Sequence, residues 1–222
     1  MSLVDKFPEI QAVLDGGSDG CIVCADCLDV LPLMPDGCVD AVVTDPPYGV
    51  KFASWDDSRP PDKWFEEIQR IAPSCAVHAA QGEIWSWPKP DWVMAWFMPG
   101  SINRTKSGKF RHWEPVLIYG KERASCDSKV FPPIGAKRNG HPCPKPDAIE
   151  NWLVGAFAKE GELICDPMMG SGTTCVAAKK LGRRYIGIDI SEEYCDIARD
   201  RLLQLDGKRL AKVVKHQGLF DV

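Results

Sequence analysis

The stretch ELICDPMMGSGTT at residues 162–174 decides the fold, because it contains a strand, a glycine turn and the first residues of a helix. The apolar run before Asp166 is typical of a buried strand. Gly170 and Gly172 let the backbone turn sharply and approach a ligand closely. The following helix offers the free N–H groups of its first turn to an acceptor. The stretch therefore predicts a ligand-binding turn, and the alternative is a plain strand–helix connection.

The same alternation of strand and helix continues along the chain. Short apolar runs predict strands over 20–26, 39–45, 75–80, 116–120, 161–166 and 183–190. Apolar residues at helical spacing predict helices over 27–34, 62–73, 145–158, 172–182 and 191–205. This order indicates an α/β, Rossmann-like fold with a mostly parallel central sheet flanked by helices. At 222 residues, we expect one domain over 1–222.

Composition and charge narrow the class of protein. The formal net charge of −4 argues against a generally sticky nucleic-acid binder. Residues 101–145, however, carry ten Lys and Arg against three acids, a local charge of +7. That segment suits a phosphate-contacting face, and a solvated surface loop is the alternative. No apolar run approaches the roughly 20 residues of a membrane span, and the first residues lack a signal-peptide pattern, so we expect a cytoplasmic protein without a membrane partner.

The ten cysteines favour reduced thiols over disulfides or metal. Most of them lie in apolar stretches, where a reduced cysteine acts as a small hydrophobe. The alternative is zinc at CIVCADC (21–27), whose three cysteines recur every third residue. A zinc site needs a fourth ligand and usually a second paired knuckle. The only obvious pair, His141 and Cys143, lies far along the chain, so we expect no metal.

Asp189 points to the ligand of the glycine turn. It follows Gly172 by 17 residues and lies at the end of the next predicted strand, where an acid can bind both hydroxyls of a ribose. The third glycine of a dinucleotide fingerprint is replaced by Cys175. Asp166 would repel a pyrophosphate but attract the cationic amino group of S-adenosylmethionine. Charge therefore favours S-adenosylmethionine as the cofactor.

Five blocks of the chain resemble the amino-directed DNA methyltransferases in the same order. They are DCLDVLPLMPDGCVDAVVTDPPYG (26–49), RHWEPVLIYGKE (111–122), HPCPKPDAIENWLVGAF (141–157), LICDPMMGSGTT (163–174) and RRYIGIDISEEY (183–194). Because the Asp-Pro-Pro-Tyr motif precedes the glycine turn, the order resembles the circularly permuted β group. The resemblance implies an S-adenosylmethionine-dependent enzyme acting on DNA. The expected target-recognition insert, 122–140, is short for this family.

The resemblance assigns the catalytic motif to Asp45, Pro46, Pro47 and Tyr48. An exocyclic amino nitrogen is a poor nucleophile, because its lone pair is conjugated into the base. Asp45 and the Pro46 carbonyl would accept hydrogen bonds from the amino group and stabilise its developing positive charge. The prolines hold both acceptors rigidly. Tyr48 offers a ring for stacking, which helps offset the cost of flipping the base out of a duplex.

Several targets fit these residues. An Asp-first motif is more typical of adenine-N6 enzymes in this family, and cytosine N4 is the alternative. Carbon methylation would need a cysteine nucleophile; Cys143 is a candidate, although no carbon-methylation pattern surrounds it. A different class is a DNA- or partner-binding module with the same fold. The intact set from Asp45 to Tyr48 argues against that module.

The resemblance also implies the binding residues and partners. The expected cofactor pocket consists of Asp26, Cys27, Lys145, Asp166, Met168, Gly170, Ser171, Gly172, Thr173 and Asp189. Basic residues expected to contact DNA are Arg104, Lys106, Lys109, Arg111, Lys137 and Arg138. The expected partner is double-stranded DNA, and a homodimer is common in the family. The tail at 217–220 loosely resembles a peptide that binds the bacterial sliding clamp, and an apolar tail packing on the body is the alternative.

Overall fold

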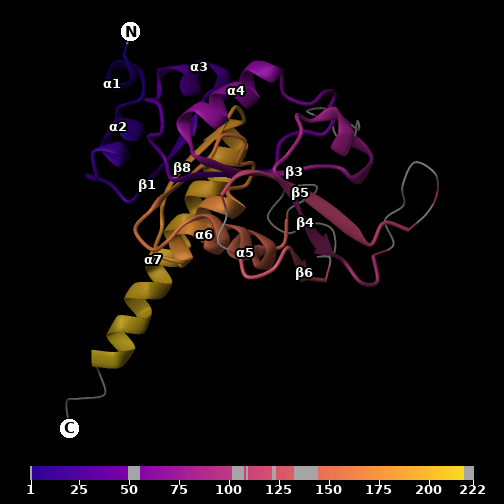
Figure 1. Cartoon of the computed structure of the whole chain (residues 1–222). Helices are drawn as coiled ribbons and strands as arrows, with labels where there is room; N and C mark the ends of the chain where they lie inside the picture. The colour runs from indigo at the N-terminus through magenta and orange to yellow at the C-terminus, as the bar shows by residue number, and fades with distance from the viewer. Residues whose placement is uncertain are drawn as a thin grey trace.

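The computed structural model describes residues 2–49, 56–101, 108, 110–121, 124–132 and 145–217, with side chains up to residue 207. Within this part of the chain, eight strands form one sheet that lies between two layers of helices (Figure 1). The sheet order is β1-β8-β7-β2-β3-β5-β4-β6. This is the α/β fold with a mostly parallel, helix-flanked sheet that the sequence predicts.

Only one of the described strands runs against the others. In chain order they are β1 (Gly20–Cys24), β2 (Ala41–Thr44), β3 (Ser74–His78), β4 (Trp92–Phe97), β5 (Trp113–Gly120), β6 (Ser128–Val130), β7 (Leu163–Asp166) and β8 (Arg184–Asp189). The five strands from β1 to β3 in the sheet order pair in parallel. β5 runs antiparallel to both β3 and β4, and β6 pairs in parallel with β4.

Two apolar cores separate the sheet from its helical layers. Alternate side chains of a strand point to opposite faces, so Val42 lies in one core while Ala41 and Val43 lie in the other. The first layer contains α1 (Leu3–Lys6), α2 (Pro8–Leu14), α3 (Cys27–Val30), the 3₁₀ helix η1 (Leu31–Leu33) and α4 (Asp62–Ile71). The second layer contains α5 (Asp147–Phe157), α6 (Thr173–Lys180) and α7 (Glu192–Gln217) (Figure 1).

The strand order brings the predicted site residues to one edge of the sheet. From β2 the chain continues outward to β3, whereas from β7 it continues in the other direction to β8. The neighbouring strands β2 and β7 therefore form a topological switch point, where open α/β sheets leave a crevice at the carboxyl ends of the strands. Asp45 follows β2 and Asp166 ends β7, so both acids lie at this switch point.

Each predicted strand and helix is present, and the structure adds elements that the sequence pattern missed. These are α1, α2, the 3₁₀ helix η2 (Gln81–Ser86), β4 and β6. β6 and the rest of 124–132 are the described part of the expected 122–140 insert, and β6 extends the sheet beyond β4. α7 continues past its predicted end at 205 and through Gly207. A single glycine costs an exposed helix only about 1 kcal/mol relative to alanine.

A search of the described helices for a membrane span found none that is both long and apolar enough.

A prediction concerns Gly187 in β8, where α6 and the glycine turn pack directly on the sheet. A Cβ added there would lie 2.5 Å from Met169 Sδ, 2.6 Å from Cys175 Sγ and 2.9 Å from Ile22 Cδ1. We expect Gly187→Ala to lower the free energy of unfolding by about 1–3 kcal/mol, because a closely packed core resists added volume. Denaturant titration measures this change.

The matched control is Gly155→Ala in α5. A Cβ there meets no atom within 4 Å, and a helix-interior glycine costs about 0.5–1 kcal/mol relative to alanine. We expect this control to stabilise the protein. Equal effects of the two substitutions would contradict the close packing at Gly187.

Candidate active site

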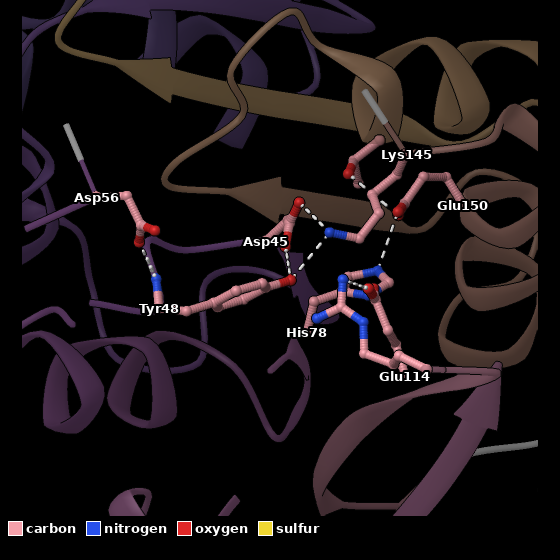
Figure 2. A network of polar contacts seen from close by, with 9 residues as sticks. Asp45, Tyr48, Asp56, His78, Glu114, Lys145 and Glu150 are labelled. Atoms are coloured by element: carbon pink, nitrogen blue, oxygen red, sulfur yellow. Dashed lines mark hydrogen bonds and ion pairs between the residues drawn. The ribbon is translucent and has the colours of Figure 1, made fainter. Parts of the chain in front are cut away.

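A buried carboxylate holds the loop that follows β2. Pro46 and Pro47 have no N–H, so the first backbone donors after Asp45 are those of Tyr48 and Gly49. Both donate to Oδ1 of Asp56, at 2.6 and 2.8 Å (Figure 2). Asp56 is only 2% exposed, and hydrogen bonds to a charged, buried acceptor are stronger than neutral ones. Asp56 thus fixes the turn that presents Asp45 and Tyr48.

Asp45, Tyr48 and Lys145 form one hydrogen-bonded group. The Tyr48 hydroxyl donates to Oδ1 of Asp45, in a very short contact. Lys145 Nζ donates to Oδ2 of Asp45 at 2.6 Å and to the Tyr48 hydroxyl oxygen at 2.9 Å. Figure 2 shows the three side chains converging from the β2 loop and from the residue before the N-cap of α5. Residues almost one hundred positions apart in sequence therefore share one carboxylate.

The electrostatics of this group favour a charged Asp45. Burial acts to raise the pKa of its carboxyl, but the Lys145 ammonium and the neighbouring His78 outweigh burial and hold the pKa below its ordinary value. Burial and the Asp45 carboxylate raise the pKa of Tyr48 well above its ordinary value. At neutral pH the site therefore holds a carboxylate beside an un-ionised phenol.

A buried polar pair lies behind this group. His78 at the end of β3 is 1% exposed, and its Nε2 lies 3.0 Å from Oε1 of Glu150 on α5, which is 2% exposed (Figure 2). The other Glu150 oxygen accepts from the Thr174 hydroxyl of α6 at 3.4 Å. His78 Nδ1 is buried and has no hydrogen-bond partner among the described residues. The pair joins β3, α5 and α6 beneath the Asp45 loop.

The glycine turn after β7 is held by two acids. Asp166 Oδ1 accepts from the Met168 N–H at 3.2 Å, and Asp189 accepts from Gly170 N–H at 2.9 Å and Ser191 N–H at 2.8 Å. Burial raises the pKa of Asp166 to about 7, although the hydroxyls of Thr174 and Thr44 act to lower it. Asp166 therefore titrates near neutral pH, and a cation placed beside it would favour its ionised form.

α7 supports the same turn from the outside. Arg201 Nη1 donates to Ser171 O at 2.5 Å, to Ser171 Oγ at 3.3 Å and to Thr173 Oγ1 at 3.2 Å. Gly172 has φ +77°, and a Cβ on it would lie 2.6 Å from Ala198 Cβ of α7. Gly172 thus serves the left-handed turn and the close packing of α7, in addition to any approach to a ligand.

The structure brings the two predicted motifs to the neighbouring ends of β2 and β7. Asp45, Tyr48 and Lys145 meet, and the turn from Asp166 to Thr173 lies at the neighbouring strand end. The sequence predicts Lys145 beside the cofactor, and the structure adds its direct contact with Asp45.

The other predicted cofactor residues lie at the edge strand β1. Asp26 follows β1 as the N-cap of α3, and its Oδ1 accepts from Leu28 N–H at 2.9 Å. Cys27 lies in the core beside it, where burial and Asp26 raise the pKa of its thiol to about 12. Cys27 is therefore a core residue with an un-ionised thiol.

Most of the predicted DNA-contacting residues lie outside the described part of the chain. These are Arg104, Lys106, Lys109, Lys137 and Arg138. Arg111 is described, and it forms an ion pair with Glu114: its Nη2 lies 3.0 Å from Glu114 Oε1 (Figure 2). Cys143 and residues 218–222 of the clamp-like tail also lie outside the described residues.

The cysteines of CIVCADC do not gather around one point. Cys21 and Cys27 are buried in the core of the first helical layer, whereas Cys24 is exposed. In the described ranges, no three His, Cys, Asp or Glu side chains are placed to hold a metal ion.

Sequence reasoning missed four residues that support the site. They are Asp56, His78, Glu150 and Arg201. Two of them gave a signal: His78 interrupts the apolar strand CAVHAA, and Glu150 falls on the apolar side of the helix over 145–158. An ionisable residue within a core-facing pattern usually has a buried partner. Asp56 and Arg201 gave no such signal, because the residues around them in the sequence are polar and typical of a protein surface.

Comparisons with known proteins show the family and the fold of the chain. A family model described as DNA methylase matches residues 78–200. The chain is 32% identical over 202 residues to "Putative methylase YubD" of Escherichia coli (strain K12), covering 80% of this chain and 87% of that protein. Two solved structures share the fold: the M1.HpyAVI–SAM complex (TM-score 0.64, 22% identity, 82% and 99% coverage) and PvuII DNA methyltransferase (cytosine-N4-specific) (TM-score 0.63, 16% identity, 83% and 86% coverage). The chain belongs to the DNA methylase family of N6-adenine and N4-cytosine methyltransferases.

Proposed function

We propose that this DNA methylase transfers the methyl group of S-adenosylmethionine to the exocyclic N6 of an adenine flipped out of double-stranded DNA. The observation that carries the proposal is the ionised Asp45 carboxylate, fixed beside the Tyr48 ring at the crevice between β2 and β7. That crevice has the glycine turn on its other side. A base amino group and a methyl donor can therefore meet there.

The chemistry asks for acceptors aimed at the amino group. Asp45 and the Pro46 carbonyl accept its two hydrogens, which draws electron density toward nitrogen and stabilises the positive charge as it forms. The nitrogen lone pair forms the bond to the methyl carbon, and the electrons of the carbon–sulfur bond stay on sulfur. The methylated nitrogen then loses one proton to Asp45. No covalent enzyme intermediate is needed.

The Tyr48 ring would hold the flipped base. Its hydroxyl is fixed by Asp45 and Lys145, and its backbone N–H by Asp56. The ring therefore loses little conformational freedom when a base stacks on it. Stacking on an aromatic side chain is worth about 1–3 kcal/mol, comparable to the cost of flipping a base.

The residues of the glycine turn fit S-adenosylmethionine, which supplies an electrophilic methyl group when bound. Asp166 is a buried carboxyl that lacks a cationic partner among its main interactions, and its raised pKa marks a place that would gain from a positive charge. Asp189 stands at the end of β8, where it could accept ribose hydroxyls besides its two backbone donors. The turn from Gly170 to Thr173 would lie against the cofactor.

Cytosine N4 is the second candidate target. The PvuII enzyme, whose fold this chain shares, is by its name cytosine-N4-specific, and both kinds of amino group present two hydrogens to the same acceptors. The Asp-first motif favours adenine by resemblance. Mass spectrometry of nucleosides from DNA methylated by the pure protein distinguishes the two targets. We expect N6-methyladenine. Detection of N4-methylcytosine instead would assign the enzyme to cytosine.

A first prediction tests Asp45. We expect Asp45→Ala to lower the rate of methyl transfer to DNA by about 100- to 1000-fold, because an acceptor that stabilises transition-state charge is lost. Binding of S-adenosylmethionine, measured by calorimetry, should stay near the wild-type value. Asp15→Ala, an exposed acid beyond α2, is the control and should keep full activity. Methyl transfer retained in Asp45→Ala would refute the proposed mechanism.

A second prediction follows from Asp166. A cationic ligand favours its ionised form, so the complex binds fewer protons than the empty protein, and affinity must rise with pH below the free pKa of about 7. We expect the association constant of S-adenosylmethionine to increase about tenfold between pH 6 and pH 8 and to level off above. In Asp166→Asn this increase should disappear. A flat profile in the wild-type protein would mean that Asp166 does not face the cationic part of the cofactor.

A further inference from the structure

The side-chain nitrogen of Lys145 lies beside Asp45 and Tyr48, where the proposed reaction requires the amino nitrogen of the base. Lys145 Nζ lies 2.6 Å from Asp45 Oδ2 and 2.9 Å from the Tyr48 hydroxyl oxygen, and 5.3 Å from the centre of the Tyr48 ring. A nitrogen donor bound to Asp45 at the edge of an aromatic ring is also what the proposed reaction requires of the base. Figure 2 shows this nitrogen between Asp45 and Tyr48.

We propose that Lys145 fills the amino-group position of the empty enzyme, and that the amino group of the target base displaces it. The inference rests on the proposed function, because it assigns an occupant to the same site. An ammonium and a base amino group are both nitrogen donors that bind carboxylate oxygens at the same distance. Lys145 is thus a positioning residue that keeps Asp45 and Tyr48 oriented until a base enters.

Lys145 and the base cannot share the carboxylate during the reaction. Tyr48 donates to one Asp45 oxygen and Lys145 to the other, so an entering amino group has to compete with Lys145 for the carboxylate. The amino nitrogen also becomes positively charged as the methyl group is transferred. An ammonium in contact with the same carboxylate would oppose that charge, so Lys145 has to leave before transfer.

Displacement of the Lys145 ammonium requires a change in its side chain only. Lys145 precedes Pro146, the N-cap of α5, so its backbone belongs to the helix entry, and its four-carbon side chain has several rotatable bonds. Asp45 retains 31% of its side-chain exposure, while Lys145 is only 9% exposed. The Asp45 carboxylate is therefore partly open to solvent, whereas the lysine that contacts it is almost fully enclosed.

The test compares Lys145→Met with Lys180→Met. Lys180 ends α6 and pairs with Asp147 of α5 at 2.8 Å, so its substitution also removes a lysine that contacts the start of α5 but leaves Asp45 untouched. Sequencing of methylated DNA first defines the target position, and a duplex with a fluorescent base analogue at that position then reports base flipping. Steady-state kinetics give kcat and the KM for DNA.

We expect Lys145→Met to capture the flipped base about tenfold more tightly, because a charged hydrogen-bonded competitor has been removed. The acid limb of kcat/KM should also move to higher pH. Burial acts to raise the pKa of Asp45, and Lys145 is the largest of the groups that oppose it, so loss of this cation raises that pKa. Lys180→Met should match wild type in both measurements.

Lys145→Gln keeps a hydrogen-bond donor for Asp45 but removes the charge. It replaces Lys145→Met in the test if the Met variant has a lowered melting temperature. It should shift base capture and the acid limb in the same direction by a smaller factor. Weaker base capture by either folded variant, or an unchanged acid limb of kcat/KM, would overturn the displacement of Lys145. The proposed function would still stand in that case if the wild-type protein methylates DNA. Absence of methylation by the wild-type protein would overturn both.

Discussion

The parallel pairing of β2 with β7 is the constraint on which the site depends. Because neighbouring parallel strands end at the same edge of a sheet, Val42 paired with Cys165 places Asp45 and Asp166 at adjacent strand ends. The chain leaves this pair in opposite directions, toward β3 and toward β8, so no crossover covers the crevice between them. The Asp45 loop and the glycine turn lie at adjacent strand ends for this reason, as the proposed reaction requires.

Charge at this edge is balanced by partners from distant elements. Asp45 has Lys145, and Glu150 has His78, at 2.6 and 3.0 Å. Asp166, in contrast, is buried among hydroxyls and has its pKa raised to about 7. A buried carboxyl without a cation is costly to ionise, and the cationic cofactor of the proposed reaction is the partner that would remove this cost. Asp45 thus already has a cationic partner, whereas Asp166 has none among its main interactions with the described residues.

The supporting contacts explain why the two halves are rigid. Asp56 holds the backbone of Tyr48 and Gly49, and Arg201 holds the glycine turn through Ser171 and Thr173. Asp56 and Arg201 each give the backbone of these segments a fixed, charged hydrogen-bond partner in place of water. A reaction that depends on acceptors aimed at one nitrogen gains from such fixed geometry, because little reorganisation remains when the substrate arrives.

The sequence by itself determined the fold class, the two motifs and their order. Apolar runs and helical spacing depend on neighbours along the chain, so β1, β2, β3, β7, β8 and helices α3 to α7 could be predicted. The strand over 116–120 could also be predicted, but tertiary structure alone decided the antiparallel direction of β5, the added strands β4 and β6, and the partners of Asp45. Lys145 contacts Asp45 across one hundred positions, and His78 contacts Glu150 across 72. Such contacts depend on which strands become neighbours in the sheet, so no pattern of residues adjacent in sequence predicts them.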